Sequence, residues 1–297
     1  MLRLRLLVLA LTFFWQAHAQ AHCPPAGHSS ASLQTLKAQQ WKIDDQAQRQ
    51  STALALLSCL SEPDPNLRDG IAFEALSHWM RNELLTTETL HNLRQILLSQ
   101  VNQDKQAEQQ GFGAPFAALV LAEVARVDRR TPFLSEAQRE EMTQSAALFL
   151  SNTEDYRGYD EQHGWRHRIA HGADWMMQLA LHPALTLAQH QVLLAALSPK
   201  IANTEHFYIY GEGARLAAPV LYIAMRSSLT TEQWREWFVK LQPPRDANQT
   251  TTQKSLARRH NFTAFLSALY VTLQESKPSP LKEKLLPPVL DAIKQMN

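Results

Sequence analysis

The chain has 297 residues with 29 basic and 28 acidic side chains, and its formal net charge is +1. This near balance, without a long basic run, argues against nucleic acid or an anionic membrane surface as a partner. The length is enough for one large domain or for an array of repeats.

The first segment predicts export. Arg3 and Arg5 form a short basic start, residues 6–15 are almost wholly apolar, and Ala17-His18-Ala19 supplies a small-residue cleavage signal. This is the pattern of a secretory signal peptide, and its apolar part is too short to span a membrane. We therefore expect residues 1–19 to be removed, with Ala19-Gln20-Ala21 as a second possible cleavage signal, and the mature protein to be periplasmic or secreted.

The only two cysteines of the chain, Cys23 and Cys59, both follow this cleavage signal. An isolated pair in an oxidising compartment most simply forms a disulfide, and two free thiols are the less favoured alternative. A lipid-modified Cys23 is disfavoured because His22 precedes it, where a small residue is expected. We expect a Cys23–Cys59 bond that ties an otherwise flexible segment, residues 20–43, to an early helix.

Residues 44–297 are predicted to form one all-α domain. Strand patterns are nearly absent, and capping boxes at Ser135, Thr186 and Thr230 each precede an apolar-periodic stretch. The predicted helices are 44–60, 66–82, 88–101, 115–126, 136–151, 165–182, 187–198, 213–228, 231–241, 252–275 and 281–295. The prolines expected to end helices are Pro183, Pro199 and Pro243.

The lengths of these helices and their mostly short connectors favour a particular arrangement. Antiparallel helix pairs stacked side by side, as in an α-solenoid or HEAT-like array, have this pattern. No repeat matches letter by letter, so the array is expected to be irregular.

Two polar connectors interrupt the helical pattern. Residues 151–164 read SNTEDYRGYDEQHG and residues 202–213 read ANTEHFYIYGEG. Loops that carry tyrosine, histidine and acidic residues on a helical scaffold are where binding groups usually lie. Asp155, Arg157 and Tyr159 are the candidates in the first connector.

Residues 163–174 read HGWRHRIAHGAD and overlap the start of the predicted helix 165–182. On a helix with about 100° per residue, the side chains of His167, His171 and Asp174 fall within about 60° of one another. The other directions are largely apolar, so the helix is expected to be buried on most sides. Each unpaired polar group would then cost about 1–3 kcal/mol, so something must meet this polar stripe.

Glu212 and Arg215 are the first candidates to meet the polar stripe. They lie three residues apart near the start of a later helix and share one face. We expect the stripe to face these two residues and the connector 155–159. An arginine–carboxylate fork between these segments would satisfy several groups together.

Three interpretations of the cluster stay open: a closed structural network, a pocket for a small molecule, peptide or protein, and a metal site. Histidines four residues apart suit zinc, with Asp174 or Glu212 as a third ligand. The chain has no H-E-x-x-H motif, so we expect no metal and no cofactor. The candidate ligand-binding residues are Asp155, Arg157, Tyr159, Trp165, His167, His171, Asp174, Glu212 and Arg215.

The leading functional prediction is a binding or interaction module. The alternative is a hydrolase-type enzyme, with or without a metal, that uses the same cluster. His167 or His171 would then act as general base and Asp174 would orient it, while Arg157 or Arg215 would stabilise an anion. A plain scaffold is the third class.

Several of these segments resemble signature blocks of a bacterial family known only as domain of unknown function 2785. The blocks are EDYRGY at 154–159, GWRHRIAHGAD at 164–174 and GEGARLA at 211–217. The stretch LRDGIAFEALSHWMRNELLT at 67–86 is similar to the family's N-terminal helix pair. The resemblance covers about residues 67–241 and implies an all-helical, HEAT-like fold with no assigned activity.

The resemblance also implies a set of signature positions, and the chain departs from the family pattern in two places. The positions are Arg157, Gly158, Trp165, His167, His171, Asp174, Glu212, Arg215 and Leu216. Gly213 stands where the family often has a second acid, and Ala114-Pro115 stands where an Arg-Ser pair is common. A ligand held by those residues in relatives would be held differently here.

Overall fold

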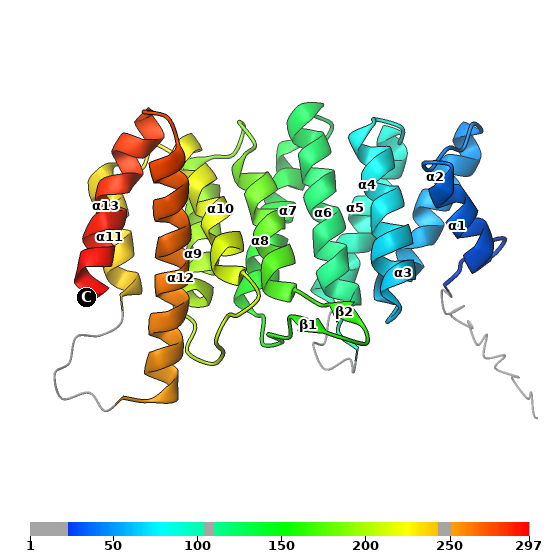
Figure 1. Ribbon diagram of the computed structural model, residues 1–297. Helices are drawn as coiled ribbons and strands as arrows, with labels where there is room; N and C mark the ends of the chain where they lie inside the picture. The colour runs from blue at the N-terminus through cyan, green and yellow to red at the C-terminus, as the bar shows by residue number, and fades with distance from the viewer. Residues whose placement is uncertain (1–22, 104–109, 243–250, 297) are drawn as a thin grey trace, which may run out of the picture.

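The computed structural model describes residues 23–103, 110–242 and 251–296, and this part of the chain is helical apart from one small hairpin (Figure 1). The expected signal peptide, residues 1–19, lies outside the described residues. Within them, no helix has the length and apolar character needed to cross a membrane. The all-α fold expected from the sequence is confirmed.

The elements in chain order, including a 3-10 helix (η1) and a π-helical segment (η2), are α1 Ser30–Ala38, α2 Gln46–Ala55, η1 Leu56–Ser61, α3 Pro65–Leu67, η2 Arg68–Phe73, α4 Glu74–Arg81, α5 Thr87–Asn102, α6 Gly113–Arg130, α7 Glu136–Ser151, β1 Tyr159–Asp160, β2 Gly164–Trp165, α8 Arg168–Ala180, α9 Leu187–Ile201, α10 Glu212–Arg226, α11 Thr231–Leu241, α12 Gln253–Glu275 and α13 Pro280–Met296. These bounds agree with most of the predicted helices to within a few residues.

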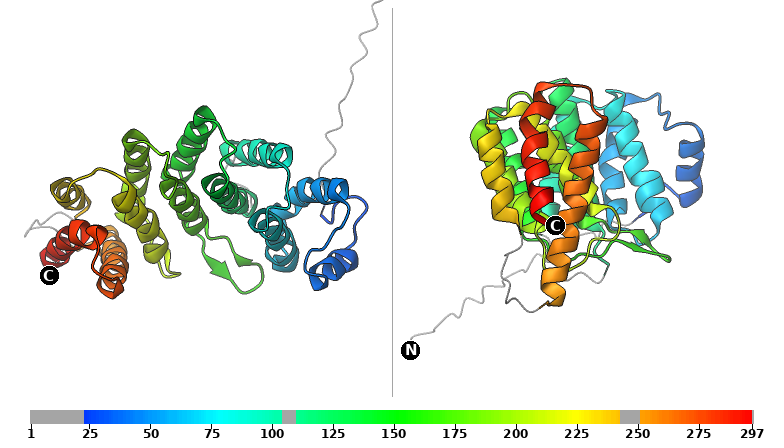
Figure 2. Two further views of the ribbon diagram at one scale, coloured as in Figure 1. Left: turned by 90° about the horizontal axis from the view of Figure 1, so that it is seen from above. Right: turned by 60° about the vertical axis from the view of Figure 1, so that its left-hand side comes forward.

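From α4 onward the helices alternate between two layers. One layer holds α4, α6, α8, α10 and α12, each packed on the next, and the other holds α5, α7, α9 and α11 (Figures 1 and 2). Helix α13 packs against both α11 and α12 at the C-terminal end. The core lies between the layers, where Trp79, Trp175 and Trp234 are fully buried.

This alternation separates the connectors by length. The short connectors 131–135, 181–186, 227–230 and 276–279 lie at one end of the array. The long connectors 152–167 and 202–211 lie at the other end, drawn at the bottom of Figure 1. We call this second end, with the first turns of α6, α8 and α10, the connector end.

Local capping explains where many helices begin. The three predicted capping boxes are confirmed: Ser135, Thr186 and Thr230 each accept from the backbone of a glutamine three residues on, whose side chain bonds back. Ser29 and Thr252 form further boxes with a serine at the third position, a weaker sequence signal. The starts of α7, α9 and α11 were therefore predictable from local chemistry.

The segment expected to be flexible, residues 20–43, contains helix α1. Its capping box at Ser29 starts the helix, and Leu33 is fully buried. The Trp41 carbonyl accepts a hydrogen bond from Nε1 of the buried Trp79 at 2.8 Å. The described part of this segment is therefore packed on the array, because its few apolar residues find a place in the core.

The prolines behave differently from one another. Helix α8 ends three residues before Pro183, as expected. Pro199 lies inside α9, which continues to Ile201, so the prediction that it ends the helix was wrong. The reason is its place in the last turn, where the lost backbone hydrogen bond matters least. Pro243 lies outside the described residues.

The predicted disulfide between Cys23 and Cys59 is confirmed. The two Cα atoms lie 5.0 Å apart, and Cys59 is fully buried in η1. The bond fastens the start of the described chain to the first helical layers across a sequence separation of 36 residues.

Removal of this bond should lower stability. A closed loop of this length is expected to contribute roughly 3–4 kcal/mol to the free energy of unfolding. Under oxidising conditions, Cys23→Ser should therefore unfold at a lower urea midpoint than wild type. After chemical reduction, the variant and wild type should have almost the same midpoint. Equal midpoints for wild type and variant under oxidising conditions would contradict the prediction.

Candidate functional site

The segment 163–174 begins as a hairpin and not as a helix. Strand β1 pairs with β2 in antiparallel register, with Tyr159 opposite Trp165. Gly164 has a φ of +73° and His167 a φ of +52°, so the chain turns twice before α8 begins at Arg168. The predicted helix start at 165 was wrong because these left-handed turns and the hairpin ladder compete with helical hydrogen bonds.

A fully buried arginine joins this hairpin to the N-terminal helices. Arg68, on η2, donates to the carbonyl of Glu62 at 2.8 Å and to that of His163 at 2.9 Å. Its guanidinium also pairs with Asp69 and lies 4.0 Å from the centre of the Phe112 ring. Backbone carbonyls of two distant segments therefore share one cation.

Two further arginines hold the hairpin to its neighbours. Arg166 donates from Nε to the carbonyl of Gln110 at 2.8 Å and pairs with Asp160. Arg168 donates to Oγ1 of the buried Thr153 at 3.1 Å. Both arginines also lie over phenylalanine rings, so their cations are shielded from water.

Side chains of α9 and α12 hold the two long connectors in the same way. Lys200 of α9 donates from Nζ to the carbonyl of Thr153, in the first connector, at 2.6 Å, and burial lowers the pKa of this lysine. In the second connector, Tyr208 and His206 bond to Asn261 of α12, which accepts from the backbone of Tyr208 at 2.8 Å and donates to the carbonyl of His206 at 2.7 Å. Side chains from the neighbouring helices thus satisfy polar backbone groups of both connectors.

Sequence reasoning missed these holding residues, which are Arg68, Arg166, Arg168, Lys200 and Asn261. All five side chains are buried, although polar side chains of these types are usually exposed. The only available signal was a lone polar side chain in a largely apolar stretch beside a polar connector. That signal does not identify the partner, because the partner lies far away in sequence.

The predicted arginine–carboxylate fork exists between α8 and α10. Arg215 donates from Nε to Oδ1 of Asp174 at 2.8 Å, and its second nitrogen contacts Oδ2. The Asp174 side chain is 15% exposed and that of Arg215 is 43% exposed. The carboxylate is therefore neutralised, while one side of the guanidinium faces solvent.

His171 does not bond to α10 as expected. His171 turns toward α6, donates from Nδ1 to the carbonyl of Pro115 at 3.2 Å and packs edge-on against Phe116. Burial, with the charges of His167 and Arg215 adding to it, holds the pKa of His171 well below its usual range. The expectation that the histidines meet Glu212 and Arg215 was wrong for His171, because it bonds to Pro115 on the side of α8 that packs against α6.

His167 precedes α8 as its N-cap residue and is partly buried. Its ring stacks on the indole of Trp165, with centroids 4.0 Å apart and planes 3° from parallel. Burial and the nearby charge of Arg215 lower the pKa of His167 to about 4. The ring is therefore neutral at pH 7.

The remaining predicted residues pair within their own segments. Arg157 donates from Nε to Oδ1 of Asp155 at 2.8 Å; although burial opposes it, this pairing lowers the pKa of Asp155. The buried Glu212 accepts from the backbone of Tyr210 at 2.8 Å, which closes the turn into α10. Asp155, Arg157 and Glu212 thus lie at the connector end, but they do not bond to Asp174 as one network.

Aromatic rings form the exposed part of the connector end. Tyr159 is 44% and Trp165 37% exposed, with ring centroids 4.8 Å apart. Tyr210 meets the Trp165 ring edge-on at 5.6 Å, and its own ring leaves no room for a side chain at Gly158. Tyr159, Trp165, Arg157 and Arg215 together define the surface that we call the connector surface.

The metal interpretation finds no ligand set in the part of the chain that the structure describes. No three histidine, cysteine, aspartate or glutamate side chains lie close enough there to hold a metal ion. His171 and Asp174 point to different helices, which separates the two ligands that the sequence placed on one face.

Loss of the buried Arg68 and loss of the half-exposed Asp174–Arg215 pair should differ in their effect on stability. Arg68→Met leaves buried carbonyls and Asp69 without their cation, so the free energy of unfolding should fall by about 3–5 kcal/mol. Asp174→Ala breaks a pair that is open to solvent on the arginine side, so about 1–2 kcal/mol is expected. Urea unfolding of both variants measures the two losses in the free energy of unfolding. A larger loss in Asp174→Ala than in Arg68→Met would contradict the prediction.

His167 should make the fold sensitive to acid. Its pKa of about 4 in the folded state lies below the ordinary value of 6.5, so the unfolded chain takes up the proton first. Its contribution is therefore complete above pH 6.5 and is lost as the pH falls toward 4. His167→Asn, which tolerates the left-handed backbone, should lose less stability than wild type between these two pH values. Parallel pH profiles of unfolding for the two proteins would contradict this.

Comparison with known proteins gives the family but no activity. The family model described as "Protein of unknown function (DUF2785)" matches residues 97–271. The match includes all three signature blocks and most of α12, whereas the similar stretch at 67–86 lies outside it. No curated protein and no solved structure matches the chain. Since the match covers more than half of its length, the chain belongs to the family "Protein of unknown function (DUF2785)".

Proposed function

We propose that this protein is a binding module that holds its ligand on the connector surface. The observation that carries the proposal is the exposed pair Tyr159 and Trp165 on a hairpin that is held in place by hydrogen bonds of the buried Arg68 and Arg166. Exposed aromatic rings on a rigid base lose little entropy on binding, so they are favourable contact residues.

The chemistry of the connector surface indicates the kind of ligand that it would fit. Tyr159 and Trp165 offer flat apolar faces, and the half-exposed Arg215 keeps donor groups toward solvent. The carboxylates beside them are already paired with arginines. A peptide or small molecule with a flat apolar part and several hydrogen-bond acceptors matches this surface better than a cation does.

We also propose that the helix pairs form a HEAT-like solenoid. The alternation of two layers and the separation of short from long connectors support this architecture. In such arrays each pair packs mainly on its neighbours, and loops on one edge are free to carry binding groups.

Export is the third part of the proposal. The predicted signal peptide and the Cys23–Cys59 bond support a periplasmic or secreted location, because disulfides persist in oxidising compartments.

The hydrolase alternative has less support from the geometry. A general base works best with a pKa near the working pH, whereas burial lowers the pKa of both His167 and His171. His171 is also engaged with the Pro115 carbonyl, and Asp174 bonds to Arg215 and not to a histidine. The base and orienter expected for catalysis are thus not assembled, which places binding ahead of catalysis.

The proposal is tested by removing the exposed rings. A panel of short peptides and of di- to tetrasaccharides is screened by thermal shift and by tryptophan fluorescence. A ligand found with wild type should bind the Tyr159→Ala/Trp165→Ala variant at least about tenfold more weakly, as expected for aromatic contact residues.

The matched control removes exposed apolar side chains elsewhere. Leu256 and Val271 are 44% and 56% exposed and belong to α12, a helix that lies apart from the hairpin in Figure 1. The Leu256→Ala/Val271→Ala variant should retain wild-type affinity. Equal affinity of wild type and the Tyr159/Trp165 variant for every ligand found would refute binding at the connector surface.

A further inference from the structure

Five arginines lie at the end of the array that is opposite the connector end, on helices α4, α6 and α10 of one layer. Arg81 lies in the last turn of α4, Arg126, Arg129 and Arg130 near the end of α6, and Arg226 in the last turn of α10. We call this group the arginine ridge. It is formed by the ends of α4, α6 and α10 that are drawn at the top of Figure 1.

Arg129 is the centre of the arginine ridge. It reaches across to α8, where one nitrogen lies 3.4 Å from Oε1 of Gln178, and its buried Nε has no hydrogen-bond partner. Burial, then the charges of Arg126, Arg130 and Arg226, lower the pKa of this guanidinium. Like charges therefore face one another across α8.

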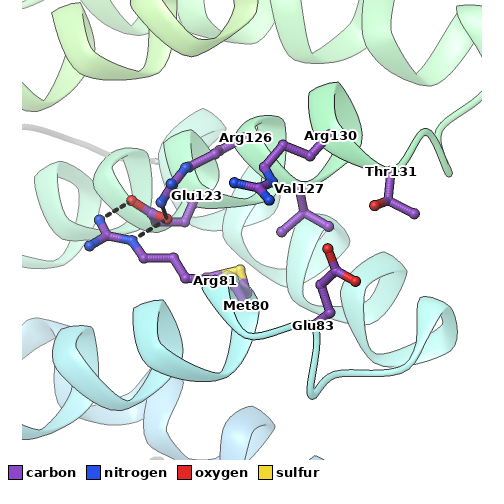
Figure 3. A pocket seen from close by; sticks show the side chains of 8 residues that line it. All are labelled: Met80, Arg81, Glu83, Glu123, Arg126, Val127, Arg130 and Thr131. Carbon is purple, nitrogen blue, oxygen red and sulfur yellow. Dashed lines mark hydrogen bonds and ion pairs between the residues drawn. The ribbon is translucent and has the colours of Figure 1, made fainter.

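Acidic side chains offset only part of this charge. Glu123 accepts from Arg81 at 2.9 Å and lies 3.6 Å from Arg126, and Glu83 lines the same small pocket (Figure 3). In residues 23–103, 110–242 and 251–296 no ion pair forms at Arg129, Arg130 or Arg226. Five guanidinium groups thus face two carboxylates.

Helix capping accounts for this arrangement only in part. Arginines in a last turn can interact favourably with the helix dipole. At the end of α10, however, Lys284 of α13 already donates to the carbonyls of Ala224 and Ser227, at 3.0 and 3.1 Å. Arg129 bonds to a side chain of α8 and not to its own helix end. A purely capping role therefore leaves Arg129 and Arg226 unexplained.

Apolar groups are interspersed among these cations. Met80 and Val127 line the pocket between Arg81 and Arg130 (Figure 3). Met225, beside Arg226, is 43% exposed. A surface that mixes guanidinium forks with apolar contacts suits a chain carrying both carboxylates and apolar side chains.

We propose that the arginine ridge binds an acidic peptide segment of a protein partner. Arg81 on α4 and Arg226 on α10 are three helix spacings apart in the layer α4, α6, α8 and α10, which at 8–10 Å per spacing is about 24–30 Å. An extended peptide of about eight residues covers this distance, whereas one small anion does not. This site is independent of the connector surface, which lies at the other end of the helices.

The test uses a labelled nonapeptide of alternating glutamate and leucine, measured by fluorescence anisotropy with the full mature protein. The glutamine–leucine peptide and pyrophosphate are the comparison probes. Wild type should bind the acidic peptide best, and the affinity should weaken steeply with added salt. Arg129→Gln/Arg226→Gln should weaken binding about tenfold or more.

The charge-matched control is Lys240→Gln/Arg259→Gln, which removes two exposed cations from α11 and α12. It should change the affinity less than about twofold, because the lost charges lie more than a Debye length away. The arginine variant should melt at the same or a higher temperature than wild type, since it relieves repulsion.

Three results would overturn the proposal. They are the absence of peptide binding by wild type, an equal loss of affinity in both charge variants, and pyrophosphate binding as tight as that of the peptide. A lower melting temperature of the arginine variant would instead assign these arginines a structural role.

Discussion

Buried cations that donate to backbone carbonyls are the interaction on which the connector end depends. Long connectors carry carbonyl groups that no helix satisfies, and a buried carbonyl without a donor is costly. Arg68 and Lys200 supply such donors from neighbouring helices, to the carbonyls of His163 and Thr153 at 2.9 and 2.6 Å. Phenylalanine rings beside the arginines keep water away and strengthen the attraction. The connectors are therefore part of the packed structure.

This interaction explains how a helical array can present fixed loops. The hairpin 159–165 has only one two-residue ladder, which alone would not hold its shape. Arg68 bonds the hairpin to η2, and Arg166 bonds it to Gln110 in the segment before α6, so the exposed rings of Tyr159 and Trp165 lie on a base that is held from two sides. Surface rings held in this way are available for contact without first having to be ordered.

Local chemistry made part of this structure predictable from sequence. Capping boxes depend on residues three apart, so the starts of α7, α9 and α11 follow directly from Ser135, Thr186 and Thr230. The disulfide followed from the number of cysteines, and the Asp174–Arg215 fork from two opposite charges on apolar helices. These features involve few alternatives.

Features that depend on distant packing were not predictable. Arg68 meets the carbonyl of His163 across 95 residues, and no periodicity connects the two. The same contact stabilises the hairpin that stands where α8 was expected to start. His167 therefore precedes the helix, and the sequence did not predict this. The residues of the polar stripe have different partners: His171 bonds to α6, and Asp174 bonds to α10. A polar cluster that the sequence places on one helix face can thus consist of two separate contacts, each made with a different neighbouring helix.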